Sequence, residues 1–479
     1  MSSLAATPMG KLCPSGSVRA ATIETLLYLS VTGAAVLAFV TGWLTLNGAV
    51  VLTVILLASL LISSWKNFDQ GRHPCFLFLS VLLLLQGGRL IAYCFGEETN
   101  PMRVRVLTPF PFDLSRDDGG LVLLCLALSA LWIYVPCRWN YRKISSPSDR
   151  SVEKYLPYLY LLFCLSLPAQ IFKNYQYYEY AHQHGGYTLL FASHSDIAAS
   201  VPFVVRAFQT ITLPVFMAIA VIERKRTLLY LTTALYFISA SLVLLLGSRG
   251  GIFALILTLW YVGRIKSGKP SHFITIAGLA AMLILLGGIV QNIRESDDTS
   301  TYEFAPIEFV GLQGNSLDVT AVAVKYHDLL ARNVGSYLWS DLQDAFVTRD
   351  PRNYTWGETL SDVGVLLNPR AFANGYGAAG SYLAELYLLG GLAGVVLVSC
   401  LIGAGIRLMY LLSSKPLPLV FVALIMPDVL LMPRGQLLNW LSVLLRYIAI
   451  AVVLWLGWLV YEFCIVLRRG ARANSQMAV

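Results

Sequence analysis

Residues 46–64 read LNGAVVLTVILLASLLISS, a run of 19 residues that contains no charged side chain. A helix of about 20 apolar residues crosses the roughly 30 Å hydrocarbon layer of a bilayer. Similar runs recur along the chain and predict twelve membrane spans, near 22–43, 46–64, 75–95, 119–136, 155–172, 200–222, 226–246, 250–264, 272–290, 382–410, 416–432 and 438–466. Two of these runs, 250–264 and 416–432, are short, which is typical of tilted or broken helices.

The composition excludes an ordinary soluble protein. Of the 479 residues, 57% are hydrophobic and only 13% are charged, whereas soluble domains carry about 25% charged residues. The net charge of +8 lies in short clusters between the apolar runs, which indicates orientation in a membrane and no binding of nucleic acid. The eight cysteines show no spacing typical of a disulfide framework or a metal site. We therefore expect neither a metal ion nor another cofactor.

Basic residues alternate between the predicted loops. If the N-terminus is cytoplasmic, every second loop is basic, as the positive-inside rule requires. The basic residues concerned are Lys66, Arg72, Arg138, Arg142, Lys143, Arg150, Lys154, Arg224, Lys225, Arg226, Arg264, Lys266, Lys269, Arg407, Lys415, Arg468, Arg469 and Arg472. The longest of the opposite loops, 291–381, carries six Lys or Arg against twelve Asp or Glu. We therefore predict that both termini are cytoplasmic and that this loop lies on the other face.

These observations predict an all-α polytopic membrane protein with about 12 transmembrane helices. Residues 1–290 hold helices 1–9, residues 382–479 hold helices 10–12 and a C-terminal tail, and the large, partly helical loop 291–381 joins the two parts. Two stretches of the loop, 316–331 and 337–347, have apolar residues on one helical face and predict amphipathic helices on the surface or over a cavity. These apolar residues are Val319, Val322, Tyr326, Leu329, Leu338, Leu342 and Phe346.

Three arginines lie on the non-cytoplasmic side, against the charge rule, at or near predicted helix ends. They are Arg206 in SVPFVVRAF, Arg249 in GSRGG and Arg434 in MPRGQ. Each can extend to the lipid headgroups or pair with a buried acid, because an unpaired arginine at membrane depth is costly. Together they indicate a cationic site for phosphate or pyrophosphate, since guanidinium groups bind such oxygens in pairs. Arg370, shortly before the tenth span, is a further candidate.

Other residues of the same face have chemistry that suits a sugar. The segment 173–196 is rich in tyrosine and histidine, including Tyr178 and His194, and its rings can contact a sugar or form an interfacial aromatic belt. Glu385 lies about one turn inside the tenth predicted span. It is either the structural counter-ion of an arginine or a general base.

The chain resembles the Wzy-type O-antigen polymerases, which polymerise oligosaccharide repeat units. The resemblance rests on Arg206 ahead of a helix with a midway proline, Pro214, and on GSRGG opening a helix. It rests further on the large loop ending in SYLAELYLLGGLAG and on Arg434 followed by glycine. These elements extend over about 200–445 in the order and on the face typical of the family, whereas the first 200 residues match in hydropathy only.

The resemblance implies a membrane glycosyltransferase of polysaccharide and lipopolysaccharide biosynthesis in the bacterial inner membrane, with the large loop in the periplasm. A growing glycan would leave its undecaprenyl pyrophosphate carrier for a hydroxyl of the next lipid-linked repeat unit. Arg206, Arg249, Arg434 and Arg370 would stabilise the leaving pyrophosphate. Glu385, or else His327 or Glu308, would accept the hydroxyl proton.

Two alternative functions remain open at this level. An O-antigen ligase, which transfers the glycan to lipid A core, would use similar arginines, and His327 in the large loop is compatible with it. A transporter or flippase of lipid-linked oligosaccharides would show inverted repeats and charges at the midplane, and the sequence shows neither. For the polymerase, the expected partners are the lipid-linked substrates, membrane lipids and a Wzz-type chain-length regulator.

Overall fold

The computed structural model describes residues 15–105, 108–139, 141–147, 149–184, 201–245, 250–295, 305–343, 355–373 and 380–477. Over these ranges the chain is almost entirely helical. The regular β-structure in them is a two-residue antiparallel pair, β1 (Arg103–Val104) and β2 (Phe112–Asp113). An all-α membrane protein was predicted, and the predominance of helix confirms the class.

Nine helices of the described part are long and apolar enough to cross a membrane. They are α1 (Ser15–Val40), α2 (Leu46–Asn67), α5 (Arg116–Arg138), α6 (Leu156–His184), α9 (Phe203–Ile222), α10 (Arg226–Leu245), α19 (Tyr382–Leu412), α20 (Pro416–Leu431) and α21 (Asn439–Met477). A bent pair, α3 (Pro74–Leu85) and α4 (Gly88–Cys94), makes a tenth span if it is counted as one. The remaining two predicted spans fall on the helices α11 (Gly250–Ser267) and α12 (Phe273–Glu295). Every predicted span therefore coincides with a helix, while the count of twelve crossings stays a prediction.

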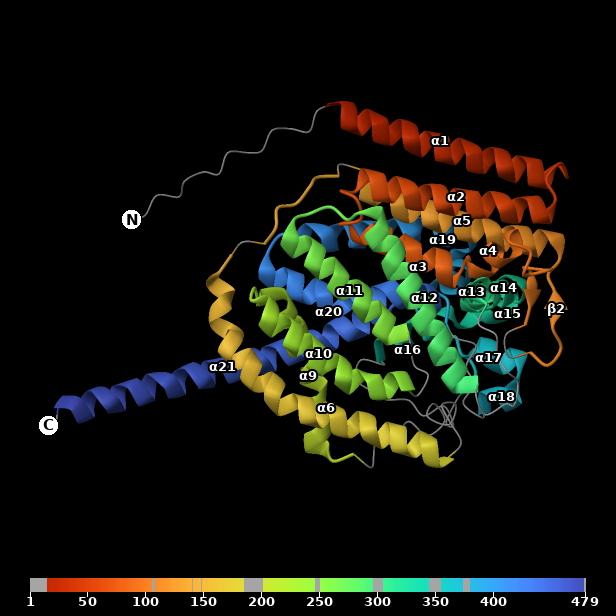
Figure 1. Cartoon of the computed structure of the whole chain (residues 1–479). Helices are drawn as coiled ribbons and strands as arrows, with labels where there is room; N and C mark the ends of the chain where they lie inside the picture. The colour runs from red at the N-terminus through yellow and green to blue at the C-terminus, as the bar shows by residue number, and fades with distance from the viewer. Residues whose placement is uncertain are drawn as a thin grey trace.

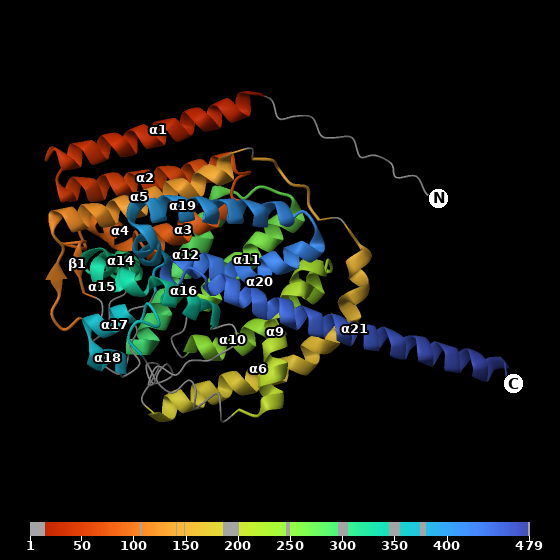
Figure 2. The same cartoon turned by 180° about the vertical axis from the view of Figure 1, so that it is seen from behind.

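The helices form successive layers. In both views α1 lies at one edge, α2 and α5 follow, and α6 lies on the opposite side of the bundle (Figures 1 and 2). In the most apolar stretch of α5, 67% of the residues are buried inside the protein, whereas the corresponding share in α1 is 6%. Helix α5 packs along α19, where Ser129 bonds to the hydroxyls of Tyr382 and Ser399 at 2.8 Å each. The N-terminal helix leaves its apolar surface for lipid, whereas α5 lies in the interior and packs against one face of α19.

Two of the spans are broken. Helices α3 and α4 meet at an angle of 64° around Gln86 and Gly87. Helix α19 departs from helical geometry at Gly390 and Gly391, and the positive φ of Gly391, 58°, is one that glycine adopts without strain. The close approach of α13 (Pro306–Gln313) to α4 depends on Gly88, where a Cβ atom would lie 2.3 Å from the carbonyl oxygen of Val310. Broken helices in membrane proteins mark places where polar backbone faces a protein interior or a cavity.

The loop between α12 and α19 contains several short helices in its described parts. Besides α13 they are α14 (Ser316–Lys325), α15 (His327–Leu330), α16 (Val334–Gln343), α17 (Asp362–Leu367) and α18 (Pro369–Ala373). In Figure 1 they gather near the ends of α4 and α12. Three single 3₁₀ turns complete the described chain, namely η1 (Ser151–Tyr155), η2 (Ala331–Asn333) and η4 (Met432–Arg434).

The burial of these loop helices differs from the expected amphipathic pattern. Every residue of α14 from Ser316 to Val324 is buried, because the helix packs between α5, α19 and the β1 strand. In α16 the buried residues are Tyr337, Ser340 and Asp341, rather than the predicted apolar face with Leu338. Phe346 of the predicted face lies outside the described residues. The buried face of α16 therefore packs against the starts of α19 and α21.

Candidate functional site

A network of buried polar side chains lies where the two broken helices meet the loop. Ser381, just before α19, is its centre: its hydroxyl accepts a hydrogen bond from Gln86 Nε2 at 2.9 Å and bonds to Thr320 Oγ1 of α14 at 2.9 Å. All three residues are buried. A serine hydroxyl can both donate and accept, so one residue joins the α3–α4 break, α14 and the start of α19.

The segment that carries Arg434 is held against this network by backbone contacts. Gln86 Nε2 also donates to the carbonyl oxygen of Pro433 at 2.5 Å, and the amide of Gly380 donates to the carbonyl oxygen of Arg434 at 3.2 Å. A Cβ atom on Gly380 would lie 2.8 Å from the carbonyl carbon of Gly435. Glycine is therefore required for two chain segments more than 50 residues apart to touch here. The side chain of Arg434 is exposed.

Two buried carboxyl groups bind consecutive amides just after Arg434. Glu385 Oε2 accepts from the amide of Leu437 at 2.7 Å, and Asp341 Oδ2 accepts from the amide of Leu438 at 3.4 Å. Glu385 is 0% exposed and Asp341 1% exposed. Glu385 Oε1 has no hydrogen-bond partner among the described residues. The two carboxyl groups thus fix the backbone that begins α21, and their proximity disfavours two full negative charges.

A buried ion pair anchors the loop to the bent span. Arg89 of α4 contacts Asp318 of α14 at 2.5 Å, and the two side chains are 4% and 3% exposed. Arg89 also donates to Asn315 Oδ1 at 3.1 Å, while Asp318 accepts from the amide of Arg105 at 2.8 Å. Sequence reasoning missed this pair, because its members are 229 residues apart and each lies in an ordinary local pattern. A buried pair is tolerated only with such additional bonds.

The other predicted cationic residues lie at the ends of helices. Arg206 is exposed in the first turn of α9, and Arg370 is exposed in α18. Arg249 lies outside the described residues, but Gly250, at the start of α11, is within reach of Leu431, since its Cβ position is 3.8 Å from Leu431 Cδ2. The start of α11 is therefore next to the end of α20. The convergence of all four arginines on one cavity stays a prediction.

The predicted proton acceptors differ in accessibility. The side chain of His327 is 37% exposed, and its ring contacts the ring of Tyr387 of α19 edge-on, with the centroids 5.2 Å apart. Glu308 is exposed on α13, whereas Glu385 is closed off from solvent. His327 thus combines partial exposure with a contact to α19.

Of the predicted sugar-binding residues, one is described. Tyr178 of α6 is partly buried and its ring stacks on that of His182, with centroids 6.1 Å apart. His194 lies outside the described residues. The stacked pair at the end of α6 offers an aromatic face of the kind that sugars contact.

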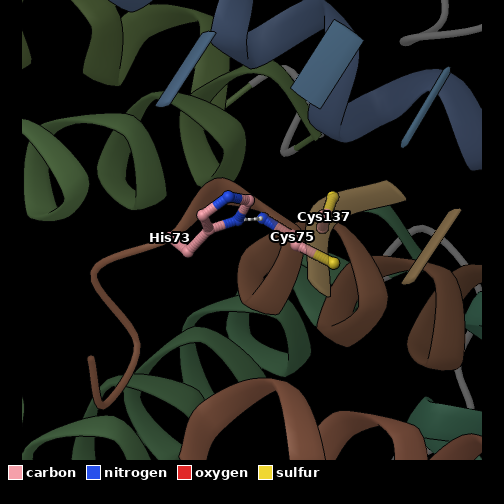
Figure 3. Close-up of side chains that lie close together, drawn as sticks. All are labelled: His73, Cys75 and Cys137. Atoms are coloured by element: carbon pink, nitrogen blue, oxygen red, sulfur yellow. Dashed lines mark hydrogen bonds between the residues drawn. The ribbon is translucent and has the colours of Figure 1, made fainter. Parts of the chain in front are cut away.

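Three potential metal ligands come together elsewhere, near the start of α3 and the end of α5. His73, Cys75 and Cys137 are buried, and their ligand atoms lie within 4.8 Å of one another (Figure 3). His73 Nδ1 accepts from the amide of Cys75 at 3.1 Å and so caps α3, while the thiol of Cys137 donates to the carbonyl oxygen of Gly403 at 3.2 Å. Burial, and to a smaller extent the charge of Arg407, lowers the pKa of His73 to about 3. His73 therefore caps α3 through its neutral ring.

The fold and the network define a multi-pass membrane protein with a buried polar site where its broken spans meet a helical loop. A family model described as O-antigen polysaccharide polymerase Wzy matches residues 23–465, nearly the whole chain. The chain therefore belongs to this family of membrane glycosyltransferases of O-antigen biosynthesis, which act on lipid-linked oligosaccharide repeat units. The curated proteins and the solved structures gave no match.

Proposed function

We propose that this protein polymerises polyprenyl-pyrophosphate-linked repeat units on the periplasmic face of the inner membrane. A hydroxyl of the acceptor repeat unit attacks the anomeric carbon of the donor glycan, and the bond between that carbon and the pyrophosphate oxygen breaks. The hydroxyl proton passes to a base of the protein, and the carrier pyrophosphate leaves. The glycosyl-pyrophosphate bond itself supplies the driving force, so the protein has to position the reactants and stabilise charge.

The observation that carries the proposal is the rigid attachment of the Arg434 segment. Gly380, Gln86 and Glu385 hold the backbone on both sides of Arg434, while its guanidinium-bearing side chain stays exposed. A cation on a fixed backbone can stabilise a leaving pyrophosphate with little reorganisation of the protein. Arg206, Arg249 and Arg370 are proposed to contribute further charge from neighbouring helix ends.

We infer different roles for the three proton-accepting candidates. Complete burial and the bond to Leu437 favour Glu385 as a positioning residue for the Arg434 segment. His327 is accessible and borders α19, which favours it as the base that takes the hydroxyl proton. Glu308 is exposed on α13 and remains the lesser candidate. Tyr178 and His194 are proposed to contact the sugar, and a chain-length regulator of the Wzz type is the expected protein partner.

The lipopolysaccharide of a deletion strain tests the reaction. A polymerase defect leaves the core with a single repeat unit, a ligase defect leaves a bare core, and an unchanged ladder on a gel contradicts both functions. Complementation with Arg434→Ala should give almost no ladder, and Arg434→Lys should give a clearly reduced one, because lysine keeps the charge and loses the planar fork. Arg226→Lys, at the exposed start of α10, is the matched control and should restore the full ladder.

A further inference from the structure

A buried arginine with an unpartnered edge lies at the other end of α3 from the candidate site. Arg72 is 1% exposed, and its Nη1 donates to Asp69 Oδ2 at 2.5 Å. Its Nε and Nη2 have no hydrogen-bond partner among the described residues. These two nitrogens form one edge of the guanidinium group, and such an edge binds two oxygens of one anion. The 12 residues of α3 separate Arg72 from Gln86 by about 18 Å.

The turn between α2 and α3, which carries this arginine, has an unusual backbone. Asp69, Gln70 and Gly71 have positive φ angles of 55°, 50° and 86°, and only glycine adopts such values without steric cost. A strained turn persists only where the surrounding structure holds it in place. Trp260 of α11 and Trp65 of α2 hold this one, since a Cβ atom on Gly71 would lie 3.4 and 3.5 Å from their rings.

Two further unpartnered donors border the same turn. Trp260 Nε1 and Ser271 Oγ are buried atoms without a hydrogen-bond partner among the described residues. The backbone amide of Ser271 donates to the carbonyl oxygen of Gln70 at 3.1 Å, so the connection between α11 and α12 touches the turn at this point. Together with the two nitrogens of Arg72, four donor atoms around one turn therefore need an acceptor, because a buried donor is costly without one.

The charges at this turn favour an anion over water as that acceptor. Asp69 is shared by two cations, since its Oδ1 also accepts from Lys143 Nζ at 2.9 Å. A third cation, Arg264, lies with its Cζ 5.7 Å from the centroid of the Trp260 ring. A water molecule has two hydrogens of its own that need acceptors, whereas an oxyanion supplies acceptors only.

We propose that the free edge of Arg72, together with Trp260 Nε1 and Ser271 Oγ, binds an anion of the phosphate class. The anion is either the headgroup of an anionic phospholipid or free phosphate, since both present the same oxygens to these donors. The side chain of Lys143 is 61% exposed and Trp260 is half-buried, so the site lies close below the surface. Basic pockets between the cytoplasmic ends of membrane helices are places where lipid headgroups bind. The site is independent of the proposed polymerisation.

Binding of radiolabelled inorganic phosphate to the delipidated full-length protein in a neutral detergent tests the site. The wild type should bind phosphate saturably. Arg72→Lys keeps the charge but loses the planar edge, and Trp260→Phe keeps the ring but loses the N–H group. Each should weaken binding about tenfold or more, because a charge-assisted hydrogen bond is lost. Arg142→Gln, at the exposed residue beside Lys143, is the control and should bind like the wild type.

Thermal stability separates the loss of a ligand from the loss of the fold. Without phosphate, Trp260→Phe and Ser271→Ala should melt at or above the wild-type temperature, because each removes a buried donor that has no acceptor. Saturating phosphate should then raise the melting temperature of the wild type more than that of either variant. Equal phosphate affinity in the wild type and both variants would overturn the site and would mean that buried water satisfies these donors.

Competition identifies the source of the anion. If a lipid headgroup is the occupant, phosphatidylglycerol in mixed micelles should displace the labelled phosphate at a lower concentration than unlabelled phosphate does. Phosphatidylcholine should be weaker, because the cations Lys143 and Arg264 repel its choline group. Displacement by unlabelled phosphate alone supports the same site with a soluble anion as its occupant. If neither phosphate nor phosphatidylglycerol binds saturably to the wild type, the proposal is wrong.

Discussion

Substitutions of Glu385 can distinguish a role in proton transfer from a role in positioning the Arg434 segment. Its carboxylate accepts from the amide of Leu437, and glutamine can accept the same bond, so Glu385→Gln should keep protein abundance and most of the polymer ladder. Leucine has the right size but no acceptor. Glu385→Leu should therefore cost about 1–3 kcal/mol, the penalty of an unsatisfied buried amide, and lower both abundance and ladder.

Three measurements on the two variants decide the role of Glu385, namely protein level, thermal stability in detergent and the ladder. If Glu385→Gln is normally abundant and stable but gives no ladder, Glu385 is the base and the assignment to His327 is wrong. His327→Gln is the companion variant, and it should remove the ladder at a normal protein level, because His327 is partly exposed and its loss leaves no buried group unpaired.

His73 gives the protein a predictable sensitivity to acid. Its folded-state pKa is lowered to about 3, below the unfolded value of about 6.5, so the unfolded state binds more protons between these two pH values. The contribution of His73 to the free energy of unfolding is therefore fully present above about pH 6.5. It decreases as the pH drops and is lower by about 2 kcal/mol at pH 5. Wild-type protein should show a larger drop in melting temperature from pH 7 to pH 5 than His73→Asn, in which asparagine can still cap α3. Equal drops would contradict the prediction.

At the scale of the elements, the broken span α3–α4 determines where the loop packs. Helix α13 lies so close to α4 that a methyl group on Gly88 would meet the carbonyl oxygen of Val310 at 2.3 Å. Backbone cannot move aside as a flexible side chain does, so Gly88→Ala should destabilise the protein by about 1–3 kcal/mol. It should also weaken the ladder, because displacement of α13 disturbs the Arg89–Asp318 pair in the next helix.

Gly335 of α16 is the matched control for Gly88, since nothing lies within 4 Å of its Cβ position. Gly335→Ala should be neutral or slightly stabilising, as alanine favours helix. The comparison is made by melting temperature in detergent and by the ladder in the deletion strain. Equal behaviour of the two variants would show that α13 and α4 do not need their close contact.

At the scale of the whole molecule, orientation in the membrane is the prediction on which the proposed reaction depends. Single cysteines at exposed positions test it in a background without the exposed Cys94 and Cys164. A thiol reagent that cannot cross the membrane should label Glu358→Cys in the large loop on intact cells, and Lys269→Cys only after permeabilisation. The reverse pattern would place Arg434 and the loop in the cytoplasm and exclude the proposed site.

The sequence alone was sufficient for the class of protein and the position of its helices. Each of the twelve apolar runs falls on a helix, because an uninterrupted run of apolar residues can satisfy its backbone in lipid only as a helix. The sequence also indicated Arg434 and Glu385 as candidate site residues. In the fold, Glu385 binds the amide of Leu437, which lies in the same segment as Arg434. Both are charges in apolar surroundings, and such charges are visible without knowledge of their partners.

Only the tertiary structure revealed which residues meet. Asp318 was one acid among many in the loop, yet it is the buried partner of Arg89. Nothing in the sequence marked Asp341 as buried, yet its carboxyl group binds the amide of Leu438. Lys173 begins the aromatic segment 173–196, yet its ammonium group donates to Gln209 of α9. Sequence periodicity reports which face of one helix is apolar. It carries no information about which distant polar group compensates a buried charge, because that depends on how the broken helices are packed.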